Sequence, residues 1–410
     1  MANPFYVTMM RRRDAIVRLG FTGAGIIVDS AMGSGALAEP ASKSWASSAE
    51  EFRWQPFELA TGNTLIVPAS IEGHAVDALL DSGSATSIVS TQLAKRLNLS
   101  GADQRIIRGM SGRANVTLLR GIAITLDGAS RTLPTAMMVD LTAVSAGFGR
   151  DVDLILGLDM LIGRSIALDF SSNRLAFQPT GAFKGGGHWR ALPLSLGANR
   201  ELLVHGEIAG EPPVPLILDL GSSSALMLSR AFVDKTRLLA NRRISSAAIG
   251  GVEGIRVASA FTLPHADLGG FRVTDVPTLA IDEWLSTSAI GNIGLPFLSQ
   301  LDLVIDLSAQ TVWVRAPQRS HRDLMLKDRS GLGVAAAASE LKVVHVAGGS
   351  PAATAGWKAG DRIIGVDGHP VDAAYTRGSV WRWRFRSAGS VVTLTMADSS
   401  KRVITLADYY

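Results

Sequence analysis

Two aspartates interrupt apolar segments of this 410-residue chain in nearly the same way. Asp81 lies in LLDSGSATSIVS (residues 79–90), and Asp219, 138 residues later, lies in LILDLGSSSALMLS (216–229). Short loops follow the acids: Ser82, Gly83 and Ser84 after the first, and Leu220, Gly221 and Ser222 after the second. A strand built for a core rarely ends on a carboxylate, a group that can accept or deliver protons in catalysis. A single Asp-Ser-Gly is ordinary turn chemistry, so the repetition carries the signal.

A second pair of segments repeats at the same spacing. The stretch DLILGLDMLIGRSIALDFSSNRLAF (153–177) matches GNIGLPFLSQLDLVIDLSAQTVWV (291–314), and it pairs Gly157 with Gly294 at an offset of 137 residues. Two independent blocks at nearly one offset indicate a duplicated unit of roughly 130 residues.

Each unit is expected to be all-β. Strand-like alternation precedes the Asp loop, a short helical patch follows it (residues 90–99 and 229–239), and a glycine hairpin comes next (108–119 and 249–261). The segment 181–190, GAFKGGGHWR, separates the units and is predicted to be a flexible linker.

An Asp-x-Gly-Ser loop after an apolar strand, with a later apolar-apolar-Gly run, resembles the active-site half of pepsin-like and retropepsin-like aspartic proteases. The resemblance covers roughly residues 55–316. It implies that Asp81 and Asp219 form a dyad that shares one proton and activates a water. It also implies that the Ser84 and Ser222 hydroxyls bind the outer carboxylate oxygens, and that the Ser82 hydroxyl braces the two loops.

The chain departs from the family pattern at two places. The second brace position is Leu220, which has no hydroxyl, and the two units contain no tyrosine that could serve as the pepsin-like flap residue. The glycine hairpins look more like retropepsin flaps, which hold substrate through backbone groups. The expected flap residues are Gly109, Met110, Ser111 and Gly112 in the first unit and Gly250 and Gly251 in the second.

The C-terminal part resembles a PDZ domain. Gly331, Leu332, Gly333 and Val334 match the loop whose backbone N–H groups hold a terminal carboxylate, and residues 350–353 and 359–363 match other recognisable stretches. The resemblance implies a groove for C-terminal peptides, which add a strand to a sheet edge. The segment WRWRFR (381–386) is expected on the helix beside that groove, with its arginines facing solvent and with no role in binding nucleic acid.

Composition and the N-terminus indicate an exported globular protein. The chain is 47% hydrophobic and 19% charged, and it has no cysteine. Removal of residues 1–38, with four Arg and two Asp, lowers the net charge from +4 to +2, which is too small to imply a polyanionic partner. Arg11–Arg13, a mild apolar stretch and Ala36-Leu37-Ala38 resemble a twin-arginine signal. We therefore expect a periplasmic or secreted protein, without nucleic acid, cofactor, metal or a stable membrane span after signal cleavage.

The predicted fold class is mainly β: two homologous aspartic-protease β-barrel lobes that form one cleft, plus a PDZ domain. The expected boundaries are an export signal at 1–38, a linker at 39–54, lobe 1 at 55–180, lobe 2 at 188–316, a linker at 317–329 and the PDZ domain at 330–408. The predicted function is an aspartic endopeptidase that acts on proteins or peptides as a monomer. One alternative is an inactive peptide-binding or sensor protein, and another is a homodimer that pairs Asp81 across two chains.

Overall fold

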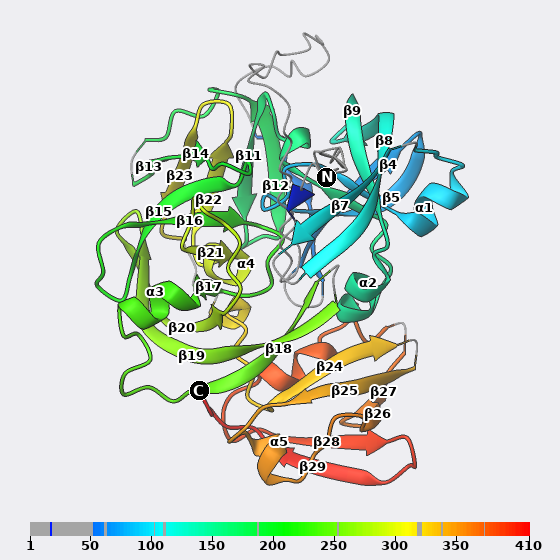
Figure 1. The fold of residues 1–410 in the computed structure, drawn as a ribbon, viewed down its shortest axis with the longest axis vertical. Coiled ribbons are helices and arrows are strands. Elements are labelled where there is room, and N and C mark those ends of the chain that lie inside the picture. Colours follow the sequence, from blue (N-terminus) through cyan, green and yellow to red (C-terminus); the bar gives the residue numbers. More distant parts are fainter. Residues whose placement is uncertain are drawn as a thin grey trace, which may run out of the picture.

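The computed structural model describes residues 17–18, 52–60, 64–101, 103–109, 112–186, 188–251, 254–317, 322–337, 339–372 and 374–410. The chain is mainly β, and it forms two lobes and a third, C-terminal module (Figure 1). The predicted fold class is therefore confirmed. Of the predicted export signal only Val17 and Arg18 lie among the described residues.

The first lobe is built on a nine-stranded sheet with the order β1-β7-β8-β9-β6-β10-β5-β4-β3. The strand bounds are Val17–Arg18 (β1), Glu58–Ala60 (β3), Thr64–Ile71 (β4), His74–Leu80 (β5), Ile88–Ser90 (β6), Asp103–Gly109 (β7), Gly112–Leu126 (β8), Ala129–Val139 (β9) and Leu154–Leu156 (β10). The helices among the described residues of this lobe are α1 (Thr91–Arg96), α2 (Thr142–Phe148) and the 3₁₀ helix η2 (Leu158–Met160).

The second lobe repeats this plan in an eight-stranded sheet with the order β14-β15-β16-β21-β17-β20-β19-β18. The strand bounds are Ser195–Leu196 (β14), Leu202–Ile208 (β15), Val214–Asp219 (β16), Leu226–Ser229 (β17), Ser245–Gly251 (β18), Gly254–Leu268 (β19), Phe271–Ile281 (β20) and Gly291–Gly294 (β21). Its helices are α3 (Arg230–Lys235) and α4 (Leu295–Leu298).

The duplication is visible in how the central strands pair. In the first lobe β10 runs parallel to β5 and antiparallel to β6, and in the second lobe β21 runs parallel to β16 and antiparallel to β17. The strands β6, β10 and β17 are buried along their whole length, which explains why they are almost entirely apolar. The helix after each Asp loop is capped in the same way, by the hydroxyls of Ser90 and Ser229.

A six-stranded sheet joins the lobes, in the order β13-β23-β22-β11-β12-β2. The strand bounds are Gln55–Pro56 (β2), Arg164–Asp169 (β11), Arg174–Pro179 (β12), Arg190–Pro193 (β13), Asp302–Asp306 (β22) and Thr311–Arg315 (β23). The central pair is β11 and β22, which are equivalent strands of the two repeats in antiparallel register. Equivalent strands that pair antiparallel are related by a local twofold rotation, so this sheet fixes the lobes face to face.

The segment between the lobes differs from the flexible linker that its glycines predict. Phe183 packs edge-on against Trp189 and Trp313, with ring centroids 5.1 and 5.7 Å apart. A Cβ on Gly185 would lie 2.3 Å from the Trp313 ring, so this glycine is needed for close packing. Aromatic burial outweighs the local freedom of the glycines here.

The C-terminal module has a sheet of order β24-β25-β26-β28-β29, with β27 paired to β26. The bounds are Leu332–Ala337 (β24), Glu340–Val346 (β25), Arg362–Val366 (β26), His369–Pro370 (β27), Val391–Met396 (β28) and Lys401–Thr405 (β29). Its helices are α5 (Pro351–Thr354) and two 3₁₀ turns, η3 (Arg322–Leu324) and η4 (Val380–Phe385). No helix in the described part of the chain has the length and apolar character that crossing a membrane requires.

Most of the WRWRFR segment forms η4, and its arginines follow the prediction only in part. Trp381 is buried and packs edge-on against Phe385, but Arg384 turns inward and donates to the carbonyl of Leu332 at 2.7 Å. Arg382 donates to the carbonyl of Asp323. Arg384 therefore departs from the predicted solvent-facing position because it finds a backbone acceptor in β24, whereas Arg386 is exposed as predicted.

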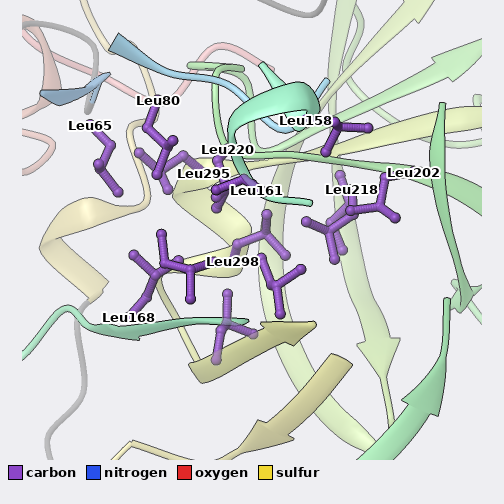
Figure 2. Packing of buried hydrophobic residues seen from close by; sticks show 14 of the residues in the cluster. Leu65, Leu80, Leu158, Leu161, Leu168, Leu202, Leu218, Leu220, Leu295 and Leu298 are labelled. Carbon is purple, nitrogen blue, oxygen red and sulfur yellow. The ribbon is translucent and has the colours of Figure 1, made fainter. Parts of the chain in front are cut away.

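A leucine-rich core lies where the lobes meet. Figure 2 shows Leu220 among leucines of both repeats, with Leu158, Leu161 and Leu295 around it. Leu220 is fully buried. The side chain that replaces the expected second hydroxyl therefore fills the interlobe core.

Candidate active site

The two aspartates occupy equivalent positions at the ends of equivalent strands. Asp81 follows β5, and its backbone N–H donates to the carbonyl of Leu156 in β10 at 2.9 Å. Asp219 is the last residue of β16 and lies opposite Gly294 of β21. Because each acid is pinned by the central strand of its own lobe, the two carboxylates are carried by rigid elements.

Glycine brings the two loops together. A Cβ placed on Gly83 would lie 2.6 Å from Cγ of Asp219, closer than real Cβ contacts allow. Gly157 and Gly294 lie in the same way against the backbone that follows each aspartate, where a Cβ would meet the carbonyls of Ser84 and Ser224 at 2.8 and 2.0 Å. Glycine is therefore required at these positions by close approach.

The two carboxyl groups are buried and coupled to each other. Asp81 and Asp219 are 0% and 1% exposed. Burial raises the pKa of Asp81 well above its ordinary value, and the neighbouring charge of Asp219 raises it further. Burial also raises the pKa of Asp219, while hydrogen bonds from Asn292, the proton on Asp81 and the backbone of Gly221 and Ser222 oppose the rise. Two buried carboxyl groups that interact this strongly cannot both ionise easily, so they titrate as a pair that shares a proton.

The Ser82 hydroxyl links the two loops, as the resemblance implies. It donates to the carbonyl of Leu218 at 2.8 Å and accepts from the N–H of Leu220 at 2.9 Å. Leu220 offers no hydroxyl for the mirror-image contact. The brace is therefore polar on one side and apolar on the other.

The serines after each glycine take partners within their own loops. The Ser84 hydroxyl donates to the carbonyl of Thr86 at 2.8 Å, which differs from the carboxylate contact that the resemblance implies. The Ser222 hydroxyl lies 3.4 Å from the carbonyl of Ser224, while its backbone N–H donates to Asp219 Oδ1 at 3.0 Å. The backbone N–H of Gly83 donates to Asp81 Oδ1, and that of Gly221 to Asp219 Oδ1.

Both predicted flaps are β-hairpins. Gly109 pairs with Gly112 at the end of the β7–β8 hairpin, and Gly251 pairs with Gly254 at the end of the β18–β19 hairpin, beyond Gly250. In Figure 1 the hairpins extend from their lobes toward the centre of the molecule. Met110 and Ser111 lie outside the described residues.

Two further polar residues near the loops escaped the sequence reasoning. Asn292 of β21 donates from Nδ2 to Asp219 Oδ2. Asp159 is buried, and it accepts from the N–H and the hydroxyl of Ser87 at 2.8 and 2.6 Å. Burial raises the pKa of Asp159 to about 6. An alignment of the two repeats could have found both residues. In that alignment Asn292 corresponds to Ile155, and Asp159 corresponds to Pro296.

The predicted carboxylate loop of the C-terminal module is partly engaged by the chain itself. The N–H of Gly331 donates to Asp328 at 3.0 Å, and that of Leu332 donates to the Ser330 hydroxyl at 3.0 Å. The loop opens into β24, where Gly333 and Val334 line a cavity. Gly333 and Val334 themselves belong to β24 and pair with His345 and Val343 of β25.

That cavity lies where all three modules meet. Its volume is about 320 Å³. The residues that line it come from α2 (Val144 and Phe148), from the second flap (Ala248 and Ile255), from the C-terminal module (Val334 and Phe385) and from the second Asp loop (Ser223). The flap is tied to the C-terminal module beside it by the hydroxyl of Ser246, which lies 2.9 Å from His345 Nε2, and by that of Ser245, which donates to Gly348.

A duplicated β lobe with one Asp-x-Gly-Ser loop per copy, closed by a shared sheet, defines the aspartic-protease fold. The model of the family described as aspartyl protease matches residues 67–160 and 204–297. The model described as PDZ domain matches residues 326–403. The chain therefore carries two retropepsin-like aspartyl protease domains followed by a PDZ domain.

Curated relatives match one part of the chain. The DNA damage-inducible protein 1 of Eremothecium gossypii is 30% identical over 125 residues, which are 30% of this chain and 25% of that protein. The protein of the same name from Cryptococcus neoformans is 30% identical over 129 residues, which are 31% of this chain and 28% of that protein. The match thus spans about a quarter of the length of these relatives.

Proposed function

We propose that this chain is an aspartic endopeptidase with one active site made from both lobes. The observation that carries the proposal is the buried Asp81–Asp219 pair, whose loops meet where Gly83 lies against Asp219. Burial raises the pKa of both acids, so the pair can hold one proton beside one carboxylate. Such a pair can activate a water and protonate a carbonyl oxygen without a nucleophilic side chain. Ser82 supports this assignment because it holds the two loops together.

The two acids take different roles in this proposal. Asp219, the better stabilised carboxylate, accepts a proton from the attacking water, and Asp81 donates its proton to the oxygen of the scissile carbonyl. The two transfers leave a neutral tetrahedral diol intermediate and a dyad that still holds one proton. Collapse of this intermediate breaks the C–N bond when Asp219 gives its proton to the amide nitrogen and Asp81 takes a proton from one diol hydroxyl. The products are a carboxylic acid and an amine, and the dyad returns to its starting state.

The PDZ domain is proposed to receive protein substrates. The cavity that continues its groove is lined by the second flap and by Ser223, which follows Ser222 of the Asp219 loop. A chain held by the PDZ domain would therefore lie next to the catalytic cleft. We further propose that residues 1–38 direct export, so that cleavage takes place in the periplasm or outside the cell.

A cleavage assay on unfolded protein tests the enzymatic proposal. The protein is incubated with a denatured proteome at several pH values, and the new termini are sequenced. Asp81→Asn and Asp219→Asn should each reduce cleavage by at least about a thousandfold, and the double variant should be little worse, because the acids act as a unit. If the protein produces no new termini at any pH, the inactive peptide-binding alternative replaces this proposal.

A further inference from the structure

The surroundings of the two catalytic aspartates differ at one equivalent position of the central strands. Asn292 lies in β21, opposite Ile217 and Met227. Its counterpart in the first repeat is Ile155 of β10, which lies opposite Leu79 and Ile88. The fold places these two residues identically, but only the second repeat carries a polar side chain there.

Asn292 is buried and bound to the reacting acid. It is 2% exposed, and its Nδ2 donates to Oδ2 of Asp219. Its Oδ1 is also buried and has no hydrogen-bond partner among the described residues. Burying an unpartnered amide oxygen is unfavourable, whereas the isoleucine of the first repeat carries no such cost. A residue that destabilises the fold beside a functional group points to a role in function.

The other donors to the two acids match each other. The backbone N–H of Gly83 and that of Ser84 lower the pKa of Asp81, and those of Gly221 and Ser222 lower the pKa of Asp219. Oδ2 of Asp81 accepts no hydrogen bond from any described donor, and Asp219 is the titratable group that faces it. Asn292 therefore supplies the donor that distinguishes Asp219 from Asp81.

We propose that Asn292 is a positioning residue that keeps Asp219 ionised as the general base and leaves the shared proton on Asp81. Its N–H group stabilises the carboxylate form of Asp219, since a hydrogen bond to an ionised acceptor is stronger than one to a neutral acceptor. Among the described residues Asp81 has no equivalent side-chain donor, so it retains the proton. The assignment of roles within the reaction rests on the proposed function.

The test compares Asn292→Leu, which keeps the size and removes the N–H, with Ile155→Leu, which changes the mirror position without removing a polar atom. Cleavage of one peptide is followed from pH 3 to pH 8. Asn292→Leu should shift the acidic limb of kcat/KM upward by about one pH unit. It should also lower kcat more than it raises KM. Ile155→Leu should keep the acidic limb of the wild type, and an unchanged limb in Asn292→Leu would overturn the proposal.

A second measurement separates this inference from the proposed function. The melting temperature is followed from pH 4 to pH 8 in wild type, Asn292→Leu, Asp219→Asn and the double variant. Loss of a donor to ionised Asp219 should make Asn292→Leu lose more stability than wild type as the pH rises, and this difference should vanish when Asp219 is replaced. This result supports the inference even if the protein cleaves nothing. Parallel curves for wild type and Asn292→Leu would overturn it whether or not the wild type is an enzyme.

Discussion

The hydroxyl of Ser82 accepts a hydrogen bond from the backbone N–H of Leu220 across the boundary between the two lobes, with 2.9 Å between Oγ and N. The same hydroxyl donates to the carbonyl of Leu218, so it satisfies two buried backbone groups of the second Asp loop. Leu220 contributes to the first lobe by packing, because it lies in the leucine core shared by both repeats. One polar and one apolar contact thus replace a symmetric pair of hydroxyls.

The first prediction concerns this brace. Ser82→Ala leaves the Leu220 N–H and the Leu218 carbonyl without their partner, so we expect the free energy of unfolding to fall by about 2 kcal/mol. We also expect kcat to fall about tenfold, since the loops that carry the acids lose their link. Urea unfolding and peptide cleavage measure the two effects. Ser84→Ala is the matched control, because its hydroxyl bonds within one loop. Equal effects of the two variants would contradict the assigned brace.

The second prediction concerns the number of chains in one active site. Both acids come together within a single chain, because β11 pairs with β22 across the lobes and Gly83 lies against Asp219. Specific activity should therefore stay constant on dilution from micromolar to nanomolar, and Asp219→Asn should abolish it. Activity that falls with dilution, together with an active Asp219→Asn variant, would indicate a site built by two copies.

The repeated segments of the chain predict the two lobes, whereas packing contacts between distant segments leave no pattern in the sequence. The offset between Asp81 and Asp219 predicts the two lobes, because each loop carries its own local pattern. The packing of Phe183 on Trp313 depends on residues 130 positions apart, and no periodicity in either segment reports it. The only sequence feature that marks Asn292 is the difference from Ile155 at the same position of the first repeat. A single asparagine in an apolar run otherwise resembles an ordinary strand residue.

The third prediction concerns the pH dependence of stability. Burial raises the pKa of Asp81 and Asp219, and it raises the pKa of Asp159 from 3.8 to about 6. An acid whose pKa is higher in the folded state binds protons more tightly there, so its stabilising effect is present at low pH and is lost as the pH rises. For Asp159 alone the loss corresponds to about 3 kcal/mol.

The free energy of unfolding should therefore be greater at pH 4.5 than at pH 8. Carboxyls with a lowered pKa, such as Asp103 and Asp140, lose their contribution only below about pH 4, outside this window. Denaturant unfolding across the range measures the slope. Asp159→Asn removes one of the titrating groups and should flatten it. A wild-type stability that increases from pH 4.5 to pH 8 would refute the effect attributed to these three acids.

The fourth prediction tests whether the PDZ groove serves the protease. Val334 of β24 lines the cavity that also touches Ala248 and Ile255 of the second flap. Val334→Glu places a charge in this apolar space and should weaken the binding of protein substrates. We expect KM to rise about tenfold, which corresponds to a loss of about 1.4 kcal/mol of binding free energy. Val391→Glu is the matched control, because Val391 lies in β28 and is 60% exposed.

The choice of substrate separates recruitment from damage to the active site. A short peptide that reaches only the cleft should be cleaved equally by Val334→Glu and by the Val391→Glu control, since neither change removes a hydrogen bond to Asp81 or Asp219. A free peptide with an apolar C-terminal residue should compete with protein substrates for wild type. Its amidated form should compete less, because the PDZ resemblance implies that the loop at Gly331–Val334 holds a terminal carboxylate. If Val334→Glu slows the short peptide and the protein substrate alike, the groove acts on the flap itself. If both substrates are unaffected, the PDZ domain has no part in their recognition, and the proposed recruitment is wrong.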